Sequence, residues 1–171
     1  MRKAFSLIEL MIVVVIIGVV YTLAITNFHT KKEGEEVLNL VNLQESMRSL
    51  AHSQSVRFLC LDDCARCEMF VDGKSYATYK DMLDSSVKSY RFDPLTGLQE
   101  AQNDLYFNEN GVEERVCFSY TIDKSGVGEQ LLVEFKKKIY DFTDYIGGTK
   151  IYDSLDAAVE AKNKLIQEVL Q

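Results

Sequence analysis

Residues Phe5 to Phe28 read FSLIELMIVVVIIGVVYTLAITNF and contain one charged side chain, that of Glu9. A helix of this length extends about 36 Å at about 1.5 Å per residue, which exceeds the roughly 30 Å hydrocarbon core of a bilayer. Arg2 and Lys3 precede the apolar stretch, so the positive-inside rule predicts a cytoplasmic N-terminus. The stretch therefore predicts one membrane-spanning helix with the rest of the chain outside the cytoplasm.

Two ordinary interpretations of this stretch fit less well. A cleaved secretory signal peptide has an apolar run of about 7–15 residues followed by a small-residue cleavage site. The run here is longer, and residues 27–32 offer no such site. A plain membrane anchor leaves Glu9 unexplained, because a carboxylate in lipid is costly unless a cation neutralises it. Glu9 therefore predicts a positively charged partner outside its own helix.

A short basic leader, Met1–Ala4, precedes the sequence FSLIELMIVV, which begins at Phe5. This order of residues resembles the class III signal of type IV pilins and type II secretion pseudopilins. The resemblance implies that a prepilin peptidase cuts between Ala4 and Phe5, that Phe5 is then N-methylated, and that Glu9 pairs with the N-terminal amine of a neighbouring subunit. Two positions depart from the family pattern, since Ala4 replaces the usual glycine and Thr26 stands where a proline is common.

The resemblance also implies a location and partners. A subunit of this family waits in the bacterial inner membrane with its domain outside and is then assembled into a pilus or pseudopilus. Its partners are other pilin or pseudopilin subunits, the prepilin peptidase and the inner-membrane assembly platform. The resemblance thus divides the chain into three parts: a leader (residues 1–4), a transmembrane and filament-core helix (residues 5–28), and an envelope-facing globular domain (residues 29–171). The retained Glu9 argues against the tip subunit of a pseudopilus, which typically lacks it.

The pattern of the remaining chain predicts an α+β fold of the pilin-like kind. Apolar residues recur at spacings of three and four up to Ala51, which predicts one long helix from about Phe5 to Ser53, with an amphipathic second half packed on a sheet. The apolar period then changes to two, and three stretches rich in aromatic and β-branched residues predict an antiparallel sheet of four to six strands. These stretches are 104–108, 113–122 and 130–142.

This part of the chain also contains residues that predict turns and helices. Asp72-Gly73 and residues 108–111 predict hairpin turns, and residues 93–97 predict a loop. Residues 80–86 are expected to form a short helix. The chain ends in a second predicted helix, capped by Asp153 or Ser154, with its apolar residues on one face: Leu155, Ala158, Val159, Leu165, Ile166, Val169 and Leu170.

Four cysteines lie in the predicted domain: Cys60, Cys64, Cys67 and Cys117. In an oxidising envelope they predict two disulfides, with three possible connectivities. A zinc site is the alternative, because the first three cysteines cluster and the fourth completes a tetrahedron. Thiol redox catalysis is disfavoured, since the acidic flanks oppose a low thiolate pKa. The last cysteine lies far from the C-terminus, so the C-terminal disulfide loop of major type IV pilins is missing, which favours a minor pilin or a secretion pseudopilin.

Composition limits the remaining function classes. The formal net charge is −7, which disfavours nucleic-acid binding, and Lys136–Lys138 is expected to be a solvated or edge-strand charge. His29 and His52 have no partner spacing typical of a triad or metal motif. Four aspartates, expected to form a solvated acidic face, match no calcium loop: Asp141, Asp144, Asp153 and Asp156.

We therefore predict a structural subunit with no catalytic residues and no cofactor. Two alternatives stay open. One is a single-pass envelope protein with a cysteine-based zinc or redox site. The other is a pilin-like DNA-uptake component with a local basic groove.

Overall fold

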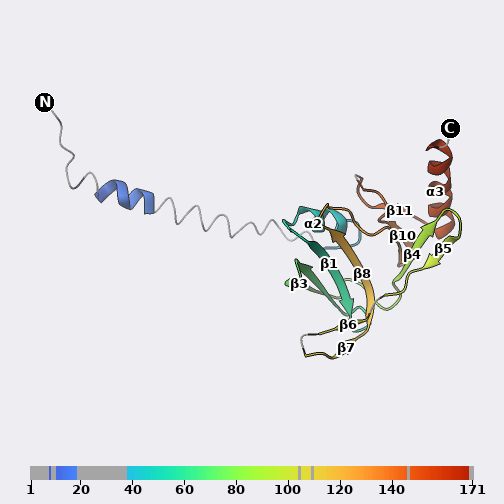
Figure 1. The fold of residues 1–171 in the computed structure, drawn as a ribbon, viewed down its shortest axis with the longest axis horizontal. Coiled ribbons are helices and arrows are strands. Elements are labelled where there is room, and N and C mark those ends of the chain that lie inside the picture. Colours follow the sequence, from blue (N-terminus) through green and yellow to red (C-terminus); the bar gives the residue numbers. More distant parts are fainter. Residues whose placement is uncertain are drawn as a thin grey trace. The chain divides into compact units, whose positions relative to one another are not determined.

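The computed structural model describes residues 8, 11–18, 38–103, 105–108, 110–145 and 147–169. The chain divides into two compact units, Met1–Val37 and Leu38–Gln171. In the first unit, Ile8 and Met11–Gly18 are helical. The described residues of the second unit form two helices and eleven strands (Figure 1). The predicted α+β class, with antiparallel sheets and a C-terminal helix, is confirmed.

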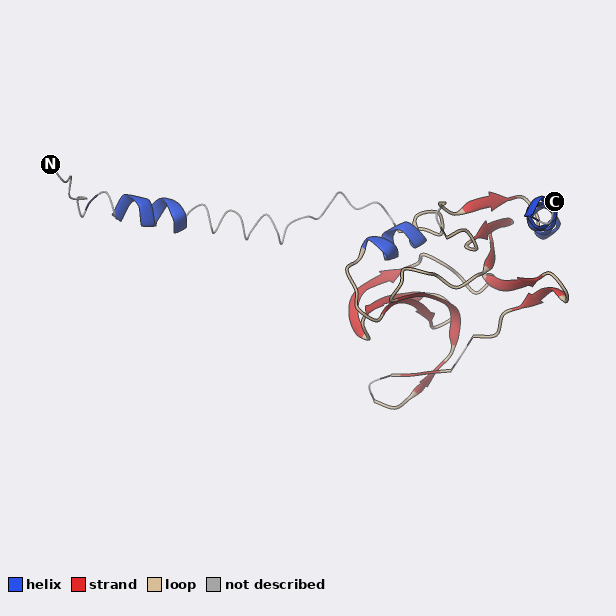
Figure 2. Ribbon diagram, turned by 45° about the horizontal axis from the view of Figure 1, so that its top comes forward, coloured by secondary structure: helices blue, strands red, loops and turns tan. Residues whose placement is uncertain are grey.

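The strands pair antiparallel in three sheets (Figure 2). The first has the order β3-β2-β1-β8, formed by Lys74–Lys80, Arg66–Val71, Ser55–Leu61 and Val116–Asp123. The second has the order β11-β10-β9-β4-β5, formed by Lys150–Tyr152, Lys138–Asp141, Leu132–Phe135, Lys88–Asp93 and Gly97–Glu100. The third is the hairpin of β6 and β7, formed by Tyr106–Phe107 and Glu113–Glu114.

The prediction of a single sheet of four to six strands is therefore wrong. The strands are shorter and more numerous, because turns interrupt stretches that look continuous in sequence. Residues 130–142 contain both β9 and β10, and the turn between them consists of Lys136 and Lys137 with φ angles of 49° and 62°. The lysine cluster is thus mostly a turn, and β10 lies inside its sheet rather than at an edge.

The predicted turns are confirmed, whereas the short helix at 80–86 is wrong. Asp72 and Gly73 connect β2 and β3 with φ angles of 50° and 77°, and the 93–97 loop connects β4 and β5. Residues 81–86 form bends and a turn. There Asp84 Oδ1 accepts a hydrogen bond of 2.9 Å from the backbone N–H of Ser86, and such local bonds compete with helical ones.

The first helix of this unit, α2, is also shorter than the sequence predicts. It covers Leu43–Ser49, so the predicted continuous helix is wrong elsewhere in residues 38–53. Asn39 Oδ1 accepts hydrogen bonds from the backbone N–H groups of Val41 at 2.8 Å and Asn42 at 3.2 Å. Asparagine side chains that bond to nearby backbone in this way favour a turn over a helix.

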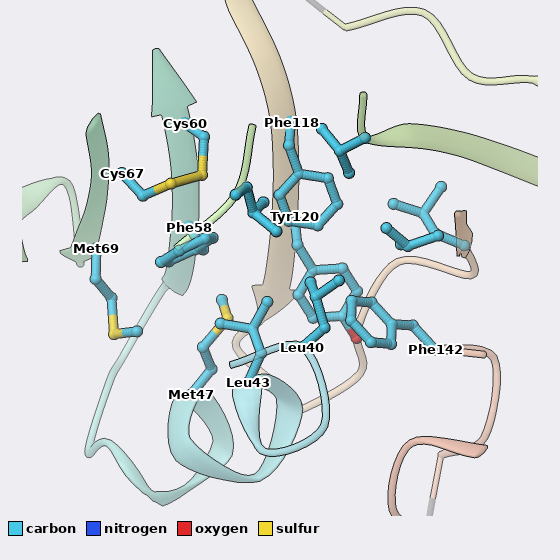
Figure 3. Close-up of a cluster of buried hydrophobic side chains, with 14 of the residues drawn as sticks. Leu40, Leu43, Met47, Phe58, Cys60, Cys67, Met69, Phe118, Tyr120 and Phe142 are labelled. Carbon is cyan, nitrogen blue, oxygen red and sulfur yellow. A yellow bond between two sulfur atoms is a disulfide. The ribbon is translucent and has the colours of Figure 1, made fainter. Parts of the chain in front are cut away.

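The main core lies between α2 and one face of the first sheet (Figure 3). Successive residues of a strand point to opposite faces, so Val56 and Phe58 of β1 face the core whereas Arg57 does not. Aromatic rings pack at its centre, with Phe118 6.3 Å from Phe58. The buried side chains shown include Leu40, Leu43, Met47, Met69, Tyr120 and Phe142.

The second sheet is covered on both faces. Val133 and Phe135 of β9 belong to the main core, whereas Leu132 packs with Ile139 and Ala158 in a smaller cluster. Because Ala158 lies in the C-terminal helix, that helix covers the face opposite the main core. This arrangement explains why all but one of the β9 residues are buried.

The C-terminal helix, α3, covers Leu155–Val169. Of the two predicted caps, Ser154 is the residue that caps the helix. Its Oγ accepts a hydrogen bond of 3.2 Å from the backbone N–H of Ala157. Ala158 is fully buried, whereas Val169 is 85% exposed. The apolar face of α3 therefore packs on the sheet only over its N-terminal part.

Candidate functional site

The residues of the expected processing site, Ala4, Phe5 and Glu9, lie outside the described residues. Within the predicted 5–28 stretch, the large apolar side chains of Ile8 and residues 11–17 are 48–68% exposed. These consecutive residues point to every side of a helix, and a helix that is apolar all round is normally surrounded by lipid or protein. Among the residues that the structure describes, no helix is both long and apolar enough to cross a membrane.

All four cysteines form disulfides. Cys60 and Cys67 are direct cross-strand partners in β1 and β2, and their bond closes this hairpin. Cys64, in the turn of the hairpin, is bonded to Cys117 of β8, with 5.6 Å between their Cα atoms. No cysteine is free, so no thiolate is left to ligate zinc or attack a disulfide. The expected preference for disulfides agrees with the structure, which also selects one connectivity.

The turn between β1 and β2 is held by charged side chains that the sequence reasoning missed. Arg66 is bound to three carboxylates, those of Asp62 at 3.3 Å, Glu68 at 2.5 Å and Glu114 at 2.9 Å. Glu114 lies in β7, so this cluster ties the small β6–β7 hairpin to the cysteine-bearing turn. Arg66 and Glu68 share one face of β2 because strand residues two apart point the same way. This spacing of an arginine and a glutamate could have predicted their ion pair from the sequence.

The carboxylate of Asp72 holds the segment that leads into β1. It accepts hydrogen bonds from the backbone N–H groups of Ser53, Gln54 and Ser55 at 2.7–3.1 Å. These bonds, the one from Ser53 first, lower the pKa of Asp72 well below its ordinary value. The same residue thus makes the β2–β3 turn and fixes the neighbouring chain.

Three of the four aspartates near the C-terminus are paired with lysines, and because Asp141 is buried the four do not form one solvated face as expected. The pairs are Asp141–Lys162, Asp144–Lys150 and Asp153–Lys138. Asp141 is fully buried, and its Oδ2 lies 2.5 Å from Nζ of Lys162. This contact is an ion pair by distance, although Oδ2 makes no hydrogen bond of good geometry. It joins α3 to β10.

In the described part of the chain, the histidine and the four cysteines all have structural partners. His52 contacts two backbone carbonyl oxygens, and the cysteines are all oxidised. In this part of the chain, no three His, Cys, Asp or Glu side chains are grouped so that they could hold a metal ion. These contacts can brace the domain.

Comparison with known proteins gives information on the N-terminal segment. Residues 1–25 match the prokaryotic N-terminal methylation motif. No curated protein and no solved structure is significantly similar to the chain. The motif supports a type IV pilin-like substrate of a prepilin peptidase. The chain thus carries at residues 1–25 the class III prepilin-type signal of type IV pilins and pseudopilins.

Proposed function

We propose that this chain is a minor type IV pilin or a type II secretion pseudopilin. One observation carries the proposal: residues 1–25 match the N-terminal methylation motif. In such a subunit, a prepilin peptidase removes Met1–Ala4 and Phe5 is N-methylated. Residues 5–28 first span the inner membrane and then form the core of the filament.

Glu9 has a specific role in this proposal. After cleavage it is the fifth residue, and its carboxylate pairs with the free N-terminal amine of a neighbouring subunit. In an apolar filament core an unpaired charge is strongly unfavourable, so this pair fixes the axial position of one subunit against the next. The apolar side chains exposed around the helix at residues 11–17 supply the rest of the packing.

The proposal assigns residues 29–171 to an envelope-facing domain. Two features of the second unit support that assignment, one to the location and one to a globular domain. Its disulfides suit an oxidising compartment, and it has its own buried core. The surface of this domain then makes the contacts with neighbouring subunits and with any external partner.

The decisive experiment is the N-terminal mass of the chain purified from the membrane of a host with an active prepilin peptidase. We expect a chain that begins at Phe5 and carries one added methyl group. A matched variant, Ala4→Arg, should stay uncut because it places a large charged residue at the scissile bond. An intact Met1 on the unaltered chain, in cells that process another prepilin, would contradict the proposal.

A further inference from the structure

Two neighbouring cavities share Arg57, on the face of the first sheet opposite the main core. The larger has a volume of about 500 Å³ and is lined by polar side chains: Ser55, Arg57, Arg91, Gln102, Ser119, Thr121 and Glu129. The smaller, of about 280 Å³, is lined by Arg57 together with Phe70 and Tyr106. Thr121 is the direct cross-strand partner of Arg57, so β1 and β8 form the floor of the larger cavity.

Arg57 is the unusual residue of this site. It is half-buried, and its Nε is fully buried without a hydrogen-bond partner in the described part of the chain. By contrast, Arg66 binds three carboxylates, and Arg91 lies 3.5 Å from Glu129. The sequence holds 26 Asp and Glu residues, yet none that the structure describes pairs with Arg57. Because Arg57 lines both cavities and no described carboxylate pairs with it, its guanidinium group is available to an acceptor that enters them.

The charge and polarity of the site limit the ligand. Arg57 and Arg91 contribute two positive charges and Glu129 one negative charge, so the net charge is +1, which matches one carboxylate better than a doubly charged phosphate. The hydroxyl and amide groups that line the cavity, from Ser119, Thr121 and Gln102, can donate to and accept from hydroxyl groups.

The smaller cavity adds an apolar surface. The rings of Phe70 and Tyr106 lie 6.3 Å apart and form one of its walls. Aromatic faces next to polar groups are typical of sites for ligands with one apolar and one polar side. A sugar ring has both, since its C–H face is apolar and its rim carries hydroxyl groups.

We propose that these two neighbouring cavities together bind a small carboxylate rich in hydroxyl groups, of the chemical class of the sugar acids. The carboxylate pairs with Arg57, the hydroxyl groups bond to Ser119, Thr121 and Gln102, and the ring faces the aromatic wall. This site is separate from the N-terminal segment, so its test does not depend on whether the chain forms a filament.

The test is calorimetric titration of the full chain in detergent with D-glucuronate, with D-glucose and acetate as partial probes. We expect saturable binding of glucuronate and binding of each partial probe at least about tenfold weaker. Arg57→Gln should weaken glucuronate binding by about tenfold or more, which equals about 1.4 kcal/mol. Arg115→Gln removes the same charge from an exposed arginine outside the site and should change the affinity by less than about twofold.

A second variant tests the proposal independently, in case Arg57→Gln does not fold. Thr121→Glu places a carboxylate directly across from Arg57, so it should abolish binding while keeping or raising the melting temperature. Equal affinities for Arg57→Gln and the unaltered chain would overturn the proposal, as would the absence of any glucuronate binding. Tighter binding of inorganic phosphate would refute the carboxylate assignment. Self-association that Arg57→Gln abolishes would assign the cavity to a second copy of the chain instead.

Discussion

Gln44 illustrates how one polar side chain can fix a helix on a sheet. It is 1% exposed, and its Nε2 donates to the hydroxyl of Tyr120 at 2.7 Å and to the carbonyl oxygen of Phe142 at 2.9 Å. Burial raises the pKa of Tyr120, so this phenol stays neutral and serves as acceptor. These bonds join α2 to β8 and to the chain after β10, and they satisfy polar groups that would be costly to bury alone.

His52 predicts a pH dependence of stability. Its Nδ1 lies 2.8 Å from the carbonyl oxygen of Leu50, and its Nε2 lies 2.9 Å from that of Asp123. Both nitrogens can donate only in the protonated ring, so the bond with Leu50, followed by the bond with Asp123, raises the pKa of His52 above 6.5. The stabilisation is therefore complete below the unfolded-state pKa and is lost as the pH rises through the higher folded-state pKa.

We expect the melting temperature to fall as the pH is raised through this window. The measurement is thermal unfolding followed by circular dichroism from about pH 5.5 to about pH 8.5. His52→Gln cannot take a proton and should show a smaller fall over the same range. Parallel curves for the variant and the unaltered chain would show that His52 does not contribute.

At the scale of the elements, the β2–β3 hairpin tests whether the positive φ of its turn requires glycine. Gly73 has a φ of 77°, a conformation that costs other residues about 1–2 kcal/mol. Gly73→Ala should lower the free energy of unfolding by about that amount, because no atom lies within 4 Å of the added Cβ and only the backbone is strained. Gly148→Ala is the matched control, since its site is equally open and has no positive φ. Urea denaturation should separate the two variants.

The elements also show which parts of the fold the sequence can predict. The β2–β3 hairpin follows from local residues, because Asp72-Gly73 suits a tight turn between alternating strands. The start of α2 could not be predicted in the same way. The apolar spacing before Leu43 fits a helix, but the side chain of Asn39 bonds to the backbone and turns the chain there. The spacing of apolar residues indicates only that they are buried, and apolar residues can be buried in a turn as well as in a helix.

Long-range pairing could not be predicted for a different reason. Four cysteines allow three connectivities, and only the register of β1 with β2 places Cys60 opposite Cys67. The cavity at Arg57 likewise needs residues from β1, β4 and β8, which are distant in sequence. By contrast, the N-terminal signal is contiguous in residues 1–25, and for that reason sequence alone indicated it.

At the scale of the whole molecule, the two disulfides differ in how much chain they close. Cys64–Cys117 spans 53 residues, whereas Cys60–Cys67 spans 7. The chain-entropy relation then gives about 4 kcal/mol for the longer loop and about 2 kcal/mol for the shorter one. We expect Cys64→Ala with Cys117→Ala to lower the free energy of unfolding more than Cys60→Ala with Cys67→Ala. Equal losses in urea titrations would mean that loop closure does not decide their contributions.

Glu9 links the processed N-terminus to assembly in the proposed function. Glu9→Gln keeps the size of the side chain and removes its charge, so it should leave cleavage between Ala4 and Phe5 intact. Incorporation into filaments should fall by about tenfold or more, about 1.4 kcal/mol, because the neighbouring amine loses its partner. The measurement compares the N-terminal mass with the amount of subunit in sheared filaments. Glu160→Gln removes the same charge from an exposed position on α3 and should alter neither quantity. Normal assembly of Glu9→Gln would show that apolar packing alone positions the subunits.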